Sequence, residues 1–244
     1  MNHFVFSASL LSIASVLTSI LAVLHRFPSR IHKIFALYWF SIGFWAFFVG
    51  WQSYLIPVLS EFWWGWLLHL GCILIPTLLL HFSFEFTREV RRKKIVLGFS
   101  YGVSATYLLL NLFTTLFTSG TAYRDMYAYP IPSFFYPMYF LTFVLSITYG
   151  TFLFIRTKSR SRKIFGNRNL RNYLIAQALG YIGGMDNFAI MADIRIFPLY
   201  PYGLYLAVLY AGVALSGRVK TLIPRRPRSL TVPASRSISP TSLP

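Results

Sequence analysis

The chain has 244 residues, of which 56% are hydrophobic and only 12% are charged, yet its formal net charge is +17. This composition is typical of membrane proteins and excludes an intrinsically disordered chain. The basic residues lie in short clusters at the ends of apolar stretches, without a continuous basic stripe, so they favour anionic lipid headgroups over nucleic acid as partners. A single cysteine, Cys72, excludes a disulfide framework and a cluster of thiolate metal ligands.

Long apolar stretches separated by short loops are the dominant pattern of the sequence. Each stretch is close to the roughly 20 residues that a helix needs to cross a bilayer. We therefore expect an all-α membrane protein, in which a bundle of seven transmembrane helices occupies residues 1–217. A basic tail rich in Pro and Ser, residues 218–244, is expected to be disordered in the cytoplasm. The seven expected spans are 4–24, 34–56, 63–86, 95–117, 134–155, 172–192 and 199–217.

Basic residues are concentrated in alternate loops, and this distribution predicts the orientation of the chain. The loops after the first, third, fifth and seventh stretches, together with the tail, hold 21 of the 23 Lys and Arg residues. Only Arg124 and Arg195 lie elsewhere. The positive-inside rule then places the N-terminus outside and the C-terminus in the cytoplasm of a multi-pass protein of the cell membrane, plasma or inner.

Aromatic residues gather at the expected outer face. The loop 119–133 is rich in tyrosine and carries Pro130 and Pro132, which predicts a cap at the level of the headgroups or, alternatively, a lid over a ligand. Four tryptophans at the outer ends of the second and third stretches are expected to anchor the chain at the same interface; they are Trp51, Trp63, Trp64 and Trp66.

Small residues four positions apart occur in two of the stretches. They are Gly98 and Gly102 in the fourth stretch and Gly180 and Gly184 in the sixth. Such pairs let the backbones of neighbouring helices approach closely. They predict helix packing within the bundle, or dimerisation as the alternative.

Polar residues within the apolar stretches are candidates for a binding site, because a polar group that faces lipid has no water to satisfy it. In the predicted topology, five of them share the outer half of the membrane, on four helices. We expect them to point into the bundle as a ligand- or proton-sensing pocket, or to bond the backbones of neighbouring helices as simple packing contacts. They are Asp186, Asn187, His69, Asn111 and Gln52.

His81 and Glu85 lie four residues apart near the cytoplasmic end of the third stretch. A single His and Glu pair cannot fill a zinc shell, so a solvated helix end with Glu85 near Arg88 and Arg91 is the preferred interpretation. Asp186 has no second intramembrane aspartate with which to form a catalytic dyad. We expect no catalytic residues, no metal and no cofactor.

The sixth and seventh stretches and the turn between them carry the most distinctive motif. A Gly-rich stretch ends in Asn187-Phe188, the turn contains Arg195-Ile196-Phe197-Pro198 and Tyr200-Pro201-Tyr202-Gly203, and the last stretch carries Leu209-Tyr210. This pattern resembles the N-terminal seven-helix membrane region of bacterial sensor histidine kinases and related diguanylate cyclases. The resemblance covers about residues 1–215. It implies a membrane sensor that passes a signal to a cytoplasmic domain.

The sequence departs from that family after Ala211, where GVALSGRVKTLIPRRPRS replaces the expected signalling helix. No histidine follows His81, so a phosphoacceptor and an ATP-binding domain are not expected, and the chain is predicted not to be an enzyme. A truncated or frame-shifted kinase and a standalone module both stay open as origins.

A sensory or signal-input module is therefore the predicted function, and a small transporter or channel-like bundle is the alternative. The expected partners are the lipid bilayer with its anionic headgroups, a small ligand from outside, and either a second copy of the chain or a cytoplasmic signalling protein.

Overall fold

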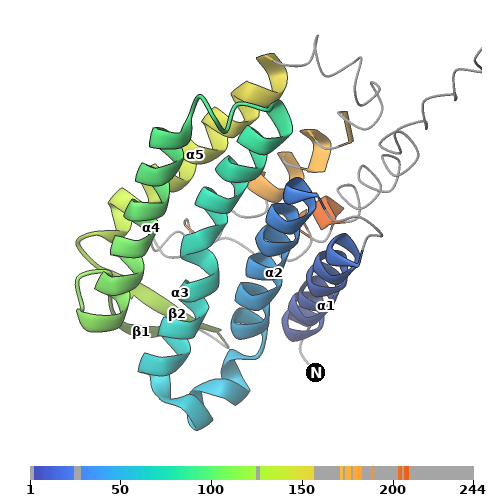
Figure 1. Ribbon diagram of the computed structural model, residues 1–244. Helices are drawn as coiled ribbons and strands as arrows, with labels where there is room; N and C mark the ends of the chain where they lie inside the picture. The colour runs from blue at the N-terminus through green and yellow to red at the C-terminus, as the bar shows by residue number, and fades with distance from the viewer. Residues whose placement is uncertain are drawn as a thin grey trace, which may run out of the picture.

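The computed structural model describes residues 3–24, 29–124 and 127–156, and the short pieces 171–172, 174–176, 178–182, 188, 203–204 and 206–208. Within these ranges, five helices are long and apolar enough to cross a membrane (Figure 1). They agree with the first five expected spans. The helices are α1 (His3–Val23), α2 (Arg30–Gly50), α3 (Gln52–Thr87), α4 (Lys94–Phe113) and α5 (Tyr136–Arg156), and a hairpin of β1 (Thr118–Arg124) and β2 (Tyr127–Pro132) joins α4 to α5.

The expected sixth and seventh spans lie largely outside the described residues, and the tail lies wholly outside them. The number of seven spans and the outward N-terminus therefore stay predictions. The described pieces of these two spans do pack together, because a Cβ placed on Gly180 would lie 3.5 Å from the Cβ of Ala207.

Helices α1, α2 and α3 lie side by side (Figure 1) and approach closely at small residues. A Cβ on Gly50 of α2 would lie 2.7 Å from the Cβ of Ala8 in α1, and a Cβ on Gly71 of α3 would lie 2.8 Å from the carbonyl oxygen of Ser41 in α2. Ser12 Oγ of α1 donates a hydrogen bond to the carbonyl of Gly43 at 2.9 Å. Such contacts are how membrane helices associate without a hydrophobic driving force.

The expected contact face of α4 differs from this pattern. A Cβ on Gly98 or on Gly102 would meet no atom of the described chain within 4 Å. These two glycines therefore do not pack against the described part of the bundle, and that prediction was wrong within it. The small residues of α4 that do meet a described helix are Ser100 and Ser104, whose hydroxyls lie 2.7 Å and 2.8 Å from Thr77 Oγ1 of α3.

The boundary between the second and third expected spans also differs from the prediction. Helix α2 ends at Gly50, and Trp51 caps it. Residues 52–56, which the sequence assigned to the second span, instead begin α3. Ser60 breaks α3 with φ 66° and ψ 160°, three residues after Pro57. The acidic Glu61 follows Ser60 directly, and the break falls within the gap 57–62 between the second and third expected spans.

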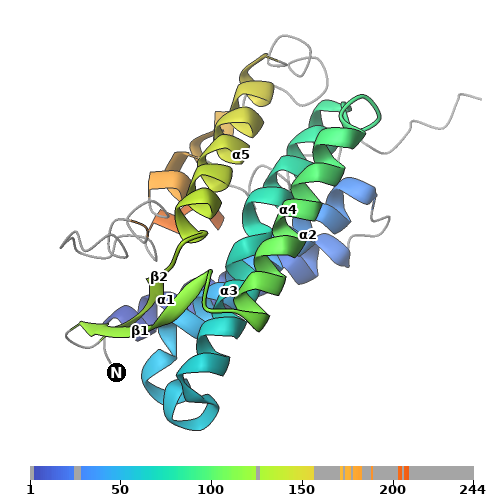
Figure 2. The same cartoon turned by 90° about the vertical axis from the view of Figure 1, so that its left-hand side faces the viewer.

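The segment 119–133 forms a hairpin, which an all-α fold does not include. Strands β1 and β2 pair antiparallel, with Thr121 opposite Pro130 and Tyr123 opposite Ala128. The hairpin lies at the end of the bundle where α3 begins (Figure 2). The predicted cap is therefore an ordered β-structure that contacts α3.

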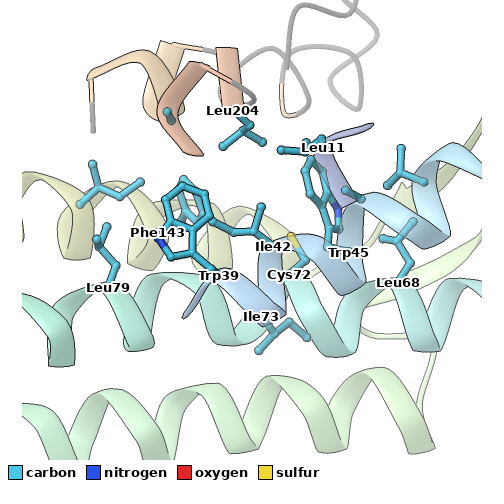
Figure 3. Close-up of a cluster of buried hydrophobic side chains, with 14 of the residues drawn as sticks. Leu11, Trp39, Ile42, Trp45, Leu68, Cys72, Ile73, Leu79, Phe143 and Leu204 are labelled. Carbon is cyan, nitrogen blue, oxygen red and sulfur yellow. The ribbon is translucent and has the colours of Figure 1, made fainter. Parts of the chain in front are cut away.

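The core is apolar and rich in aromatic side chains. Trp39, Ile42 and Trp45 of α2 lie on the same side of α3 as Cys72, while Ile73 points to the opposite side of that helix (Figure 3); all five belong to one buried cluster. The same cluster includes Leu11, Phe143 and Leu204, which come from α1, α5 and the seventh expected span. Described pieces of that span thus contribute to the same core as the first helices.

Candidate ligand site beneath the hairpin

A cavity of about 300 Å³ lies where the hairpin meets the ends of α3 and α4. Its position follows from the fold, since the break at Ser60 starts the long part of α3 beside the hairpin and α4 ends just before it. Its volume is at the lower end of the range for small-molecule sites. The wall residues are Glu61, Phe62, Gly65, Trp66, Asn111, Thr114, Thr115, Thr118, Ser119, Gly120, Thr121 and Pro130.

Asn111 provides a buried polar group in the cavity wall. Its side chain, on the last turn of α4, is only 4% exposed. Thr118 Oγ1 donates a hydrogen bond to its Oδ1 at 3.2 Å, while its Nδ2 has no partner among the described residues. A buried amide without a partner costs free energy, so a ligand with an acceptor atom would satisfy this group.

Trp66 contributes a second N–H donor to the wall. Its Nε1 is buried and has no partner in the described part of the chain. The neighbouring Trp64 differs, because it is fully buried and donates its Nε1 to the carbonyl of Phe48 at 2.8 Å. The prediction that both are interface anchors was therefore wrong for Trp64, which packs in the core, and incomplete for Trp66, which also lines the cavity.

Glu61 brings the only carboxylate among the wall residues, and it is exposed to solvent. The hydroxyl of Tyr123, from the hairpin, donates a hydrogen bond to Glu61 Oε1 at 2.7 Å. This hydrogen bond raises the pKa of Tyr123 above its ordinary value, with smaller effects of burial and of the negative charge. The contact ties the hairpin to the start of the long part of α3.

His69 lies behind the cavity wall and is fully buried. Its Nδ1 donates to the carbonyl of Gly65, itself a wall residue, at 2.8 Å. Because the carbonyl can only accept, Nδ1 carries the proton, and Nε2 is an acceptor without a partner among the described residues. The imidazole packs edge-on against the rings of Phe117, at 5.3 Å, and Tyr136, at 6.0 Å.

The predicted polar set is thus brought together only in part. Asn111 lines the cavity, and His69 adjoins it through Gly65 and through Phe117, the residue before Thr118. Gln52 is buried at the start of α3 but is not among the residues that line the cavity. Asp186 and Asn187 lie outside the described residues.

Phe188, which follows Asn187 directly, is the described residue closest in sequence to Asp186 and Asn187. The ring of Phe188 packs against Phe140 at 4.7 Å and against Tyr136 at 6.3 Å. Tyr136 also contacts His69. The end of the sixth expected span therefore packs against the α5 residue that touches His69, and convergence of Asp186 with His69 stays a prediction.

A second polar cluster lies at the opposite end of α3. Arg30 Nε is 2.8 Å from Glu85 Oε1, although without hydrogen-bond geometry, and His81 Nε2 is 3.9 Å from the same oxygen. His81 Nδ1 and the hydroxyl of Tyr101 in α4 are 2.8 Å apart. Glu85 therefore pairs with the first residue of α2, rather than with the expected Arg88 or Arg91. No group of three or more His, Cys, Asp or Glu side chains that could hold a metal occurs within the described ranges.

Comparison of the chain with protein-family models, with curated proteins and with solved structures found no match.

Proposed function

We propose that this chain is a membrane signal-input module that recognises a small molecule in the cavity beneath the hairpin. The motif around Asn187-Phe188 and Tyr200-Pro201-Tyr202-Gly203, which resembles the membrane region of sensor histidine kinases, supports the sensory part of this proposal. The cavity supports the recognition part. The observation that carries it is the buried Asn111 amide, whose Nδ2 has no protein partner in the described chain at the wall of a cavity large enough for a ligand.

The alternative function is a small transporter or channel-like bundle. Such a protein needs a polar path from the cavity to the other end of the bundle. In the described part of the chain, the middle of α3 carries apolar side chains that are at most 1% exposed, which are Ile73, Leu78, Leu79 and Phe82. The buried hydroxyls beside them, of Thr77, Ser100 and Ser104, are hydrogen-bonded to one another. This packing favours recognition at one end over transport.

A cavity-filling substitution tests the proposal. Gly65 lines the cavity, and a Cβ placed on it would meet no atom of the described residues within 4 Å, so Gly65→Leu should fill the site without disturbing the described helix packing. Gly98→Leu is the matched control, because Gly98 is a helical glycine that is also open but lies away from the cavity.

The measurement is ligand-detected NMR of the full chain in nanodiscs against a library of small polar compounds. We expect compounds that bind the wild type and Gly98→Leu but not Gly65→Leu. The proposal fails if every compound that binds the wild type also binds Gly65→Leu. Uptake of a cavity ligand into proteoliposomes that contain the protein would instead establish the transporter.

A further inference from the structure

We infer that the cavity selects a small organic cation, an ammonium compound that also carries an oxygen acceptor. Glu61 would hold the ammonium group at the rim, and the N–H groups of Asn111 and Trp66 would donate to the oxygen within. This inference rests on the proposed function and adds the chemical class of the ligand.

The charge distribution around the cavity favours a cation. The other two acidic residues with described side chains, Glu85 and Glu89, lie at the far end of α3 or in the turn that follows it, so Glu61 is the described acid at the hairpin end. Apart from Arg171, which lies just before the sixth expected span, the described Lys and Arg side chains lie at the end of the bundle opposite the hairpin, where α2 and α4 begin and α3 and α5 end. Only Arg124, whose side chain is outside the description, lies on the hairpin itself. Within the described residues, the Glu61 carboxylate therefore has a hydroxyl partner and no cationic one.

The walls next to Glu61 suit a positive charge as well. Phe62 and Trp66, one and five residues after Glu61 on α3, both line the same cavity. An ammonium group close to an aromatic face is attracted by the ring quadrupole, and Trp gives the strongest interaction. A cavity lined by one carboxylate and two aromatic residues therefore favours an ammonium compound over a neutral compound of the same shape.

The inner part of the site requires an acceptor. The buried Nδ2 of Asn111 and the buried Nε1 of Trp66 have no partner in the described chain, and both residues line the same cavity. Thr118 can donate to one end of the Asn111 amide, but it leaves the other end for a ligand. A buried donor that stays unpaired makes binding of an analogue without the oxygen less favourable. The site thus selects ligands that carry both an ammonium group and an oxygen acceptor.

The test uses four probes of nearly equal size with the full chain in nanodiscs at pH 7. Tyramine carries both an ammonium group and a hydroxyl, tyrosol replaces the ammonium with a hydroxyl, and phenethylamine lacks the phenol oxygen. In 4-hydroxyphenylacetate a carboxylate replaces the aminomethyl group of tyramine. Dissociation constants are measured by equilibrium dialysis. We expect tyramine to bind about tenfold more tightly than tyrosol, since a partly exposed ion pair and a cation–π contact act together.

Two variants assign the selectivity to residues. Glu61→Gln should bring the affinity for tyramine to that for tyrosol while leaving tyrosol binding unchanged. Asn111→Leu should instead reduce the preference for tyramine over phenethylamine. Glu89→Gln is the matched control, because it removes one negative charge from the opposite end of α3 and should keep both preferences.

The outcomes separate this inference from the proposed function. Equal affinity for tyramine and tyrosol, or tighter binding of 4-hydroxyphenylacetate, would overturn the cation assignment while leaving a functional pocket. Selectivity that survives in Glu61→Gln would also overturn it. Failure of all four probes to bind would overturn the inference. The proposed function fails as well only if the NMR library also yields no compound that binds the wild type but not Gly65→Leu.

Discussion

The contact between α2 and α3 at Gly71 gives a quantitative test of the fold. An alanine Cβ at position 71 would lie 2.8 Å from the carbonyl oxygen of Ser41 and 3.0 Å from the backbone nitrogen of Trp45. Both atoms belong to the backbone of α2, so the helix itself has to move. Overpacking of this kind costs about 1–3 kcal/mol.

Gly102→Ala is the control for this substitution. A Cβ on Gly102 of α4 meets no described atom within 4 Å. Both substitutions gain about 1 kcal/mol of helix propensity, so the difference between the two variants isolates the contact. We expect Gly71→Ala to unfold with a free energy about 1–3 kcal/mol lower than Gly102→Ala.

The free energies of unfolding can be measured in mixed micelles of dodecylmaltoside and SDS, with tryptophan fluorescence as the signal. The mole fraction of SDS at the midpoint should fall for Gly71→Ala relative to Gly102→Ala. Equal free energies of unfolding for the two variants would refute the close approach of α2 and α3 at this position.

Two further predictions concern α5 and the hairpin. A Cβ on Gly150 would lie 2.8 Å from Ser83 Oγ, so Gly150→Ala should destabilise the protein in the same unfolding assay. Adding Ser83→Ala should restore the lost stability. If the double variant is no more stable than Gly150→Ala, the contact is contradicted. Because the pKa of Tyr123 is raised, the folded chain keeps the phenol proton to a higher pH than the unfolded chain does. The contact with Glu61 therefore stabilises the fold below about pH 10, and this stabilisation is lost as the pH rises through the raised pKa. In ¹³C-tyrosine NMR, Glu61→Gln should lower the titration midpoint of Tyr123, and an unchanged midpoint would show that Glu61 is not its partner.

The first five helices were predictable because membrane helices have a strong local signal. About twenty apolar residues suffice to identify each one, as in α1 and α5. Hydropathy placed the gap 57–62 around the break at Ser60, but it did not show that α2 ends as early as Gly50. The hairpin was missed for a different reason, because strand pairing depends on contacts between β1 and β2 rather than on hydropathy, and Pro130 and Pro132 favour a loop.

The candidate site was only partly predictable from the sequence. Asn111 stood out as a polar residue inside an apolar stretch, and such residues are expensive in a membrane. Glu61 and Trp66 lie between or at the edge of the stretches, where a carboxylate and tryptophans are ordinary. The cavity itself depends on the hairpin, which brings Thr118 and Tyr123 beside α3 and α4. The sequence offered a lid over a ligand as one interpretation of the loop 119–133, but it did not show which residues of α3 and α4 the loop would meet.

We propose that the cavity beneath the hairpin opens to the outside of the cell and holds a small molecule. Labelling of a single cysteine tests it most directly. Thr115 lines the cavity and is exposed, so Thr115→Cys in a Cys72→Ala background can be treated in intact cells with an impermeant maleimide, with Lys93→Cys as the marker for the opposite side. We predict that Thr115→Cys is labelled in intact cells, that tyramine slows this labelling, and that Lys93→Cys is labelled only after permeabilisation. Labelling of Thr115→Cys only after permeabilisation, or at a rate that no cavity ligand changes, would contradict the account.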